Sequence, residues 1–168
     1  MATIRILGLD PGLRRMGWGV IDVAGSKLSH VAHGVIATQA NDSLGIRLYC
    51  LHRELERVIA ETRPVAMVVE QAFVHRDPSA ALKLGHARAI ALLAGAQAGL
   101  EIAEYAPNHI KKSVVGVGHA AKEQVQAMVR RLLPACGVDG ADAADALAAA
   151  IAHAHLASGR ARILAALA

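Results

Sequence analysis

Aromatic side chains are scarce in this sequence, because Phe, Trp and Tyr together make up only 2% of its 168 residues. The core of such a chain has to be filled by aliphatic side chains and alanine, and a hydrophobic fraction of 54% is enough for a folded core. A fraction of this size excludes a wholly disordered chain. Each aromatic residue therefore needs an explanation of its own, above all Phe73, the single phenylalanine.

The sequence also lacks closely spaced cysteines and long apolar runs. Cys50 and Cys136 have no CxxC spacing, which disfavours a disulfide and favours free thiols in a reducing compartment. The longest apolar run, residues 89–100, falls well short of the ~20 residues that span a bilayer. The first residues, MATIRILGLD, meet an acid too early for a signal peptide. We therefore expect a cytoplasmic protein in which residues 1–168 form a single domain.

A net negative charge is absent as well. With 18 Lys and Arg against 14 Asp and Glu, the net charge is +4 and the isoelectric point is about 9.4. This balance favours an anionic partner such as a nucleic acid. It carries no information about the fold, and many proteins with this charge bind no polyanion.

Hydrophobic periodicity predicts five strands and four helices. The strands are expected over residues 3–9, 17–23, 27–38, 65–70 and 101–107, and the helices over residues 43–63, 79–99, 120–133 and 142–157. The continuous apolar run VAMVVE at residues 65–70 suits a central strand that is buried on both faces. The order predicts an α/β fold with a mixed five-stranded sheet, which starts with an antiparallel three-stranded hairpin unit and carries helices on both faces.

Two of the predicted strands end in a carboxylate. Asp10 follows the apolar run of the first strand, and Glu70 closes the strand VAMVVE. An ionised carboxylate at the edge of an apolar core is costly unless a cation or several hydrogen-bond donors compensate its charge. Alone, Asp10 fits a metal ligand, a phosphate-binding hairpin or a simple turn. We interpret Gly12, Gly17 and Gly19 as the hairpin that carries the chain away from it.

The last predicted helix begins with two further acids. Asp142 and Asp145 are spaced i, i+3, which places both on one face of a helix. Asp139 or Asp142 alone fits a helix cap, a position where acids are favoured. Capping does not explain Asp145, whose neighbours are small and apolar.

These four acids together predict a metal site. If they converge, their mutual repulsion requires divalent cations, and oxygen ligands select Mg²⁺ or Mn²⁺ over zinc. Two such ions about 4 Å apart can activate a water and stabilise the leaving oxygen of a phosphodiester, which predicts hydrolysis of a nucleic-acid backbone. His153 lies about 16 Å along the helix from Asp142, too far to share an ion with it. We expect His153 and His155 to pack or to face solvent.

The chain resembles the RuvC family of bacterial Holliday-junction resolvases, which belongs to the RNase H-like/retroviral-integrase superfamily. The resemblance rests on four segments that span nearly the whole chain in the order of the family: LGLDPGLRRMGWGV, VVEQAFVHRDPSAALKLGHARA, EYAPNHIKKSVVGVGHAAKEQVQAMV and DAADALAAAIAHAH. It implies an RNase H-like fold in which the catalytic and metal-binding residues are Asp10, Glu70, Asp142 and Asp145. Some relatives carry His at the position of Asp142, so this chain has the all-carboxylate version.

The same resemblance implies what the protein does. A homodimer is expected to bind a four-way DNA junction and to nick two strands of like polarity symmetrically, which leaves 5′-phosphate and 3′-hydroxyl ends. Mg²⁺ is the expected cofactor, with two ions per active site, and Mn²⁺ is expected to substitute for it. The RuvA and RuvB branch-migration complex is the expected protein partner, and DNA recombination and repair are the expected processes.

Candidate DNA contacts lie in two segments. Phe73 belongs to QAFVHRDP, an odd place for a core residue, and the resemblance assigns it to stacking on an unpaired base, which is worth about 1–3 kcal/mol per base. Lys111, Lys112 and Lys122 surround a Gly-rich loop and form either an ordinary solvated face or contacts to phosphates beside the scissile bond. The resemblance assigns catalytic support to Lys111 and Lys122, whereas Lys112 and Arg76 are candidates for contacts with the DNA backbone.

Three alternatives stay open at this point. Another RNase H-like nuclease, of the YqgF type, would share GLDPG and a late Asp but would not be expected to carry the Phe73 segment. A nucleotide-binding module of the actin, Hsp70 or sugar-kinase type would need a second lobe with its own phosphate loop. A non-catalytic junction-binding protein would have no need of four acids that repel one another and the DNA.

Overall fold

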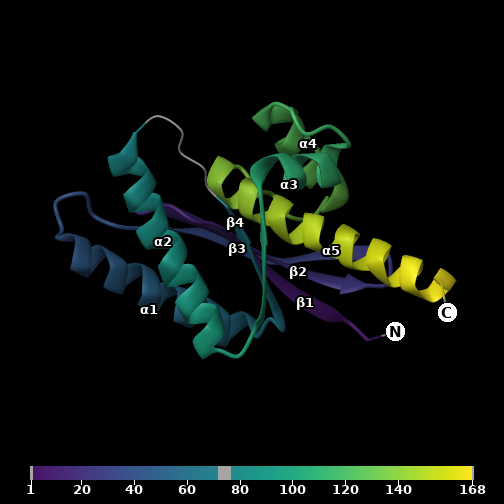
Figure 1. Cartoon of the computed structure of the whole chain (residues 1–168), viewed down its shortest axis with the longest axis horizontal. Coiled ribbons are helices and arrows are strands. Elements are labelled where there is room, and N and C mark those ends of the chain that lie inside the picture. Colours follow the sequence, from purple (N-terminus) through teal and green to yellow (C-terminus); the bar gives the residue numbers. More distant parts are fainter. Residues whose placement is uncertain (1, 72–76, 168) are drawn as a thin grey trace.

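A five-stranded mixed sheet forms the centre of the computed structural model, which describes residues 2–71 and 77–167 (Figure 1). The strands are β1 (Ile4–Asp10), β2 (Arg15–Ala24), β3 (Lys27–Ala37), β4 (Ala66–Glu70) and β5 (Glu101–Tyr105). The helices are α1 (Leu44–Thr62), α2 (Pro78–Gln97), α3 (Pro107–Val115), α4 (Lys122–Leu132) and α5 (Ala141–Leu167). All five expected strands and all four expected helices are present, and apart from the last helix their ends differ from expectation by at most two residues.

The strands lie in the order β3-β2-β1-β4-β5, with β1, β2 and β3 antiparallel and β1, β4 and β5 parallel. This confirms the mixed sheet that starts with an antiparallel three-stranded unit. β1 pairs with β2 so that Asp10 lies opposite Gly17, and with β4 so that Leu9 lies opposite Val69. Because β1 and β4 are parallel neighbours, their carboxyl ends lie at the same edge of the sheet, and Asp10 and Glu70 lie there with them.

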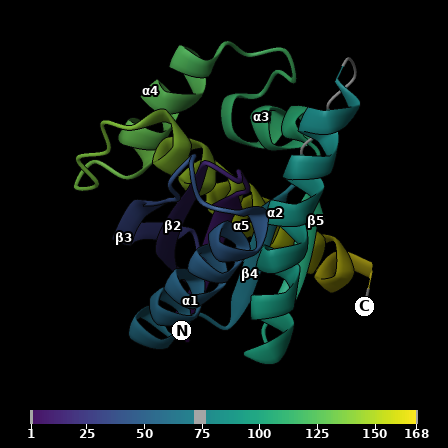
Figure 2. The ribbon, with the colours of Figure 1, turned by 90° about the vertical axis from the view of Figure 1, so that its left-hand side faces the viewer.

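Helices cover both faces of the sheet, as expected (Figures 1 and 2). α1 and α2 lie on one face, where Leu9 and Met67 from the sheet meet Leu55 of α1 in one core cluster. α5 lies on the other face, where Val68 and Leu147 share a second cluster, and α3 and α4 pack against α5. Alternate residues of β4 therefore enter two different cores, which explains why every residue of this strand before Glu70 is apolar.

The core is aliphatic, as the composition predicts. The largest fully buried side chains among the described residues are all Leu, Ile, Val or Met. Both cysteines are free thiols, with Cys136 buried in the core and Cys50 half-buried. Within the two described ranges, no helix has the length and apolar character needed to cross a membrane.

The backbone of α5 lies directly against the sheet because glycines face it from β1 and β2. A Cβ atom on Gly8 would overlap the carbonyl oxygen of Ala146, and a Cβ atom on Gly17 would overlap that of Asp142. The missing side chains thus leave room for the helix backbone itself. Gly17 and Gly19 lie inside β2, the second strand of the predicted hairpin, and both also face α5, a contact that the sequence did not predict.

A helix that the sequence did not predict, α3, follows β5. The segment expected to be a Gly-rich loop begins with nine helical residues, from Pro107 to Val115. Pro107 stands at the first helical position, Gly116 ends the helix in the left-handed conformation (φ 95°), and Ile110 and Val114 are buried one turn apart. Proline at the start and glycine after the end are ordinary helix signals, and the short length of the helix concealed them.

The last helix is longer than expected, since α5 continues to Leu167 instead of ending near residue 157. The residues that follow Gly159 are mostly alanine, leucine and arginine, which are strong helix formers. A single glycine costs about 1 kcal/mol in a helix and does not end this one.

We expect a methyl group at Gly8 to destabilise the protein. Because Gly8→Ala would force the backbones of β1 and α5 apart, its free energy of unfolding should fall by about 1–3 kcal/mol. Gly45→Ala is the matched control: Gly45 lies in the first turn of α1 with nothing near the added atom, and its variant should be unchanged or stabilised by up to about 1 kcal/mol. Urea unfolding followed by circular dichroism measures both values. Equal effects of the two substitutions would contradict the close packing of α5.

Candidate active site

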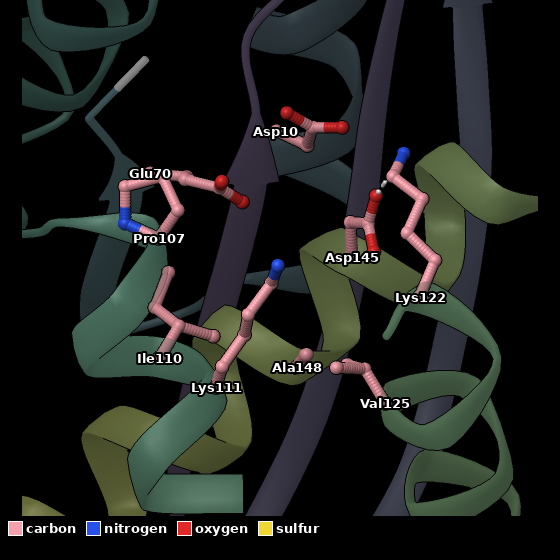
Figure 3. Close-up of a pocket in the computed structure, with 9 residues that line it drawn as sticks. All are labelled: Asp10, Glu70, Pro107, Ile110, Lys111, Lys122, Val125, Asp145 and Ala148. Carbon is pink, nitrogen blue, oxygen red and sulfur yellow. Dashed lines mark ion pairs between the residues drawn. The ribbon is translucent and has the colours of Figure 1, made fainter. Parts of the chain in front are cut away.

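A pocket of about 250 Å³ lies at the edge of the sheet where β1 and β4 end (Figure 3). Its lining residues are Asp10, Glu70, Pro107, Ile110, Lys111, Lys122, Val125, Asp145 and Ala148. They come from β1, β4, α3, α4 and α5, so segments from the whole length of the chain meet here. Three acids and two lysines share the cavity, and the rest of its wall is apolar.

The sheet supplies two of the acids. Asp10 is the last residue of β1 and Glu70 is the last residue of β4. Side chains two residues apart on a strand share a face, so Asp10 follows Gly8, and Glu70 follows Val68, onto the face that carries α5. Figure 3 shows both carboxylates directed into the pocket. Two strands that end in an acid thus bring those acids to one place, as the sequence predicts.

Helix α5 supplies the third acid of the pocket, Asp145. The contact between Gly17 and the backbone of Asp142 holds the first turn of α5 over β2, and Asp145 follows on the same side of the helix. The carboxylate of Asp145 forms an ion pair with Lys122, the first residue of α4, whose Nζ lies 3.1 Å from Asp145 Oδ2 (Figure 3). The side chain of Asp145 is only 16% exposed, so this pair is largely shielded from water on the acid's side.

The fourth predicted acid, Asp142, lies beside the pocket and does not line it. Arg15 Nε donates a hydrogen bond to Asp142 Oδ2 at 2.6 Å, and the two side chains form an ion pair. The charge of Asp142 still reaches the pocket, because it contributes to the raised pKa of Asp10. The structure therefore gathers three of the four predicted acids in one cavity and places the fourth next to them.

Two of the three lysines expected to contact DNA line the pocket. Lys111 reaches it from α3 and Lys122 from α4, whereas Lys112 is exposed and does not line it. Consecutive helical residues point about 100° apart, so only one of the neighbouring lysines on α3 can face the cavity. Hydrogen bonding to Asp145, together with the charge of that residue, raises the pKa of Lys122, which keeps this lysine charged at neutral pH.

The strand-end acids have strongly raised pKa values. Burial raises the pKa of Asp10 to about 7, and the charges of Asp145 and Asp142 add to the effect. Burial also raises the pKa of Glu70 to about 8, with further contributions from Asp10 and Asp145. The lysines oppose these shifts without cancelling them. Near pH 7 a large fraction of these two carboxyl groups therefore carries a proton, which a bound cation would displace.

The donor set fits a hard divalent cation. All four acids offer oxygen ligands, and a cation that displaced the protons of Asp10 and Glu70 would offset the negative charge that burial and repulsion disfavour. Within residues 2–71 and 77–167, however, no three His, Cys, Asp or Glu side chains already stand close enough together to hold an ion. The two acids of α5 instead have basic partners, Arg15 and Lys122. The residues thus suit a hard divalent cation in kind, and holding one would require their side chains to rearrange.

The sequence did not predict the ion pair between Arg15 and Asp142. The arginine lies 127 residues from Asp142 in the sequence, and no local pattern links the two. The contact exists only because α5 crosses the start of β2, a detail of packing that periodicity does not reveal.

Other predicted residues have different outcomes. Phe73 and Arg76, the predicted base-stacking and backbone contacts, lie outside the described residues. The two histidines of α5 make structural hydrogen bonds, His153 Nδ1 with the hydroxyl of Tyr105 at 2.9 Å and His155 Nδ1 with the carbonyl oxygen of Ser113 at 3.1 Å. These contacts agree with the expectation that His153 and His155 pack or face solvent.

Comparison with known sequences finds one family over most of the chain. The family model for the crossover junction endodeoxyribonuclease RuvC matches residues 6–153. The chain is 58% identical to the crossover junction endodeoxyribonuclease RuvC of Cereibacter sphaeroides over 98% of both chains. It is 60% identical to the RuvC of Paracoccus denitrificans over 94% of this chain and 96% of the relative.

Solved structures give the same picture. The chain superposes with a TM-score of 0.88 and 34% identity on Thermus thermophilus RuvC in complex with a Holliday junction substrate, over 94% of this chain and 96% of the other. The yeast mitochondrial Holliday junction resolvase Ydc2 matches with a TM-score of 0.68 at 13% identity, over 96% of this chain and 84% of the other, which shows a shared fold. The expected RNase H-like arrangement is thereby confirmed.

The raised pKa of Asp10 predicts an unusual pH dependence of stability when no metal is present. The folded state holds its proton up to about pH 7, whereas the unfolded state loses it near pH 4. The free energy of unfolding should therefore fall as the pH rises from about 4 to 8. In EDTA at pH 9, Asp10→Asn should be more stable than the wild type by at least about 1 kcal/mol, measured by thermal unfolding.

Asp22→Asn provides a control of opposite sign. Arg5 lies 2.8 Å from Asp22, and hydrogen bonding to this arginine lowers the pKa of Asp22. Its carboxylate is therefore stabilising above about pH 4, and that contribution is lost only as the pH falls through its lowered pKa. Asp22→Asn should accordingly reduce stability at pH 9. Destabilisation by both asparagine variants would contradict the raised pKa of Asp10 in the folded protein.

Proposed function

Because this chain belongs to the RuvC family of crossover junction endodeoxyribonucleases, we propose that it resolves Holliday junctions by nicking two strands of like polarity symmetrically, leaving 5′-phosphate and 3′-hydroxyl ends. The observation that carries the proposal is the pocket in which Asp10, Glu70 and Asp145 face Lys111 and Lys122. Such a cavity offers ligands for cations and positive charge for phosphates in one place. The role is in DNA recombination and repair, and residues 1–168 are taken as a single nuclease domain.

The four carboxylates would hold the metal. Asp10, Glu70 and Asp145 are already at the pocket, and Asp142 would join them by a change of side-chain conformation. Mg²⁺ bound there supplies Lewis acidity and a nucleophilic water for phosphodiester hydrolysis. We assign two ions to each site, as the resemblance implies, with Mn²⁺ as a substitute. The carboxylates must be deprotonated to bind them, so loading is favoured above the raised pKa values of Asp10 and Glu70.

The lysines would act on the phosphates. Lys122 is charged and is the first residue of α4, and Lys111 reaches the same cavity from α3 (Figure 3). Positive charge fixed at these two points would position the phosphates beside the scissile bond and stabilise the negative charge that develops during hydrolysis. Lys112 lies outside the pocket, which leaves it a contact with the DNA backbone at most. We assign Phe73 to base stacking and Arg76 to backbone contact on sequence grounds.

We also propose a homodimer, since paired nicks require two active sites. Helix α2 supports this idea, because its buried residues are all alanine or glycine while Leu82 and Leu93 are 64% and 49% exposed. The small residues pack inside this chain, whereas the two leucines lie on the outer face of the same helix, where a second copy could cover them. The partnership with the RuvA and RuvB complex and a cytoplasmic location stay predictions from sequence.

Family membership removes two of the three alternatives that the sequence left open. The match to the RuvC family model over residues 6–153 argues against a YqgF-type nuclease and against a nucleotide-binding module. A junction-binding protein without activity keeps the same fold, so a cleavage assay has to separate it from a resolvase.

The first test is cleavage of a synthetic four-way junction in Mg²⁺. We expect symmetrical nicks that disappear in EDTA, and we expect Asp10→Asn and Glu70→Gln each to slow cleavage by about 10³-fold or more, because each removes a charged ligand. Junction binding, measured by gel shift, should persist in both variants. Equal cleavage of a linear duplex of the same sequence would overturn junction selectivity, and activity in EDTA would overturn the site.

Neighbouring lysines give a sharper test of the pocket. Lys111→Met should slow cleavage of the bound junction by about 10²-fold, because it removes positive charge from the cavity wall. Lys112→Met removes the same charge from the adjacent residue outside the cavity and should leave this rate close to that of the wild type. Single-turnover cleavage at saturating protein separates the rate from binding. Equal losses in both variants would mean that the lysines act only as a diffuse basic surface.

A further inference from the structure

Arg15 has no part in the proposed chemistry, yet it forms an ion pair with Asp142, one of the four acids. It is the first residue of β2, and its Nε lies 2.6 Å from Asp142 Oδ2. The side chain of Arg15 is 55% exposed and that of Asp142 is 32% exposed, so both remain accessible from solvent. Arg15 therefore lies next to the candidate metal site and is also accessible to a ligand that approaches from solvent.

The packing of α5 against β2 fixes the backbone positions of Arg15 and Asp142. Arg15 and Gly17 are two residues apart on β2 and share the face that carries α5. Gly17 meets the backbone of Asp142 directly, which holds the start of α5 beside the start of β2. The two charged side chains thus project from backbone segments that are fixed against each other. No backbone segment has to be ordered to form this pair, so its entropic cost is the loss of side-chain freedom alone.

Arg15 and a divalent cation would compete for the same carboxylate. An Asp142 oxygen that accepts a hydrogen bond from a guanidinium does not offer that lone pair to a metal. Lys122 holds Asp145 in a similar way, at 3.1 Å. Both acids of α5 are thus engaged by basic side chains, in contrast to the strand-end acids Asp10 and Glu70, which carry raised pKa values instead.

We propose that Arg15 is a positioning residue that exchanges partners during binding. It holds Asp142 in the metal-free protein, and when Asp142 turns to a cation, the released guanidinium contacts a phosphate of the junction. This inference rests on the proposed function, because it takes Asp142 as a metal ligand and the pocket as the place where the DNA backbone passes. An arginine suits the exchange, since its planar fork pairs with carboxylate and phosphate alike.

The exchange couples the two ligands. Arg15 weakens metal binding to the free protein, because the ion pair has to break first. A DNA phosphate that draws Arg15 away frees Asp142 and so favours metal binding. By thermodynamic reciprocity, a bound metal must strengthen junction binding by the same factor. The nuclease would accordingly take up its cations most readily when a junction is already in place.

Direct binding of Mn²⁺ without DNA tests the first half of the proposal. Arg15→Gln should bind Mn²⁺ about two- to fivefold more tightly than the wild type, the range expected for loss of one partly exposed ion pair, measured by electron paramagnetic resonance of the free ion. Arg14→Gln is the charge-matched control, because Arg14 is exposed and takes part in no ion pair among the described residues. Mn²⁺ binding by Arg15→Gln that is no tighter than by Arg14→Gln would overturn the exchange.

Junction binding tests the second half. The measured quantity is the ratio of junction Kd in EDTA to junction Kd in Ca²⁺, by fluorescence anisotropy, with the DNA confirmed intact on a denaturing gel. This ratio should be about two- to fivefold smaller in Arg15→Gln than in the wild type and unchanged in Arg14→Gln. An equal ratio in the wild type and Arg15→Gln would show that the guanidinium does not pass to the DNA.

The outcomes separate this inference from the proposed function. A wild type that binds neither Mn²⁺ nor the junction would overturn both, whereas a wild type that binds both ligands, with Arg15→Gln unaltered, would overturn only the exchange. If Arg15→Gln fails to fold, Arg15→Lys takes its place, because it keeps the charge and loses the fork. Arg15→Lys should then bind Mn²⁺ about twofold more tightly than the wild type, and unchanged binding would overturn the proposal.

Discussion

The contact between the backbone of α5 and the glycines of β1 and β2 is the constraint on which the rest of the site depends. Gly8 and Gly17 let the helix backbone lie directly against the strands, at Ala146 and Asp142. The depth of the helix then determines where its acids stand relative to Asp10. A side chain at either glycine would lift α5 and move two of the four acids away from the strand ends. Small residues inside the sheet thus control the geometry of charged residues at its edge.

The same site combines two opposing requirements. Burial and mutual repulsion raise the pKa values of Asp10 and Glu70, so ionising these carboxyl groups is costly. A bound cation would offset that cost. Lys122 and Arg15 reduce the repulsion around the acids of α5 without removing it. The protein therefore stores unfavourable electrostatic energy at the place where catalysis needs it. A site without unfavourable electrostatic energy in its ion-free state would gain less from binding the ions and would have a lower affinity for them.

Much of this arrangement can be predicted from the sequence, and the remainder cannot for physical reasons. Apolar periodicity locates the strands, and parallel strands that both end in an acid imply that Asp10 and Glu70 meet. Helix α3 carries ordinary signals at Pro107 and Gly116 but is short enough to be read as a loop. The pair of Arg15 with Asp142 has no signature at all, because it joins residues 127 positions apart through the packing of a helix on a strand. Local patterns reveal elements, whereas contacts between elements depend on how closely they pack.

The order of the segments along the chain has a consequence for how the pocket is assembled. β1 supplies Asp10 near the start of the sequence, and α5, which covers β1 and supplies Asp145, is the last helix of the described chain. Contacts between such distant segments form late in folding, because the loop between them has to close first. The pocket is therefore incomplete until α5 has packed against β1, because α5 supplies both Asp145 and part of the pocket wall.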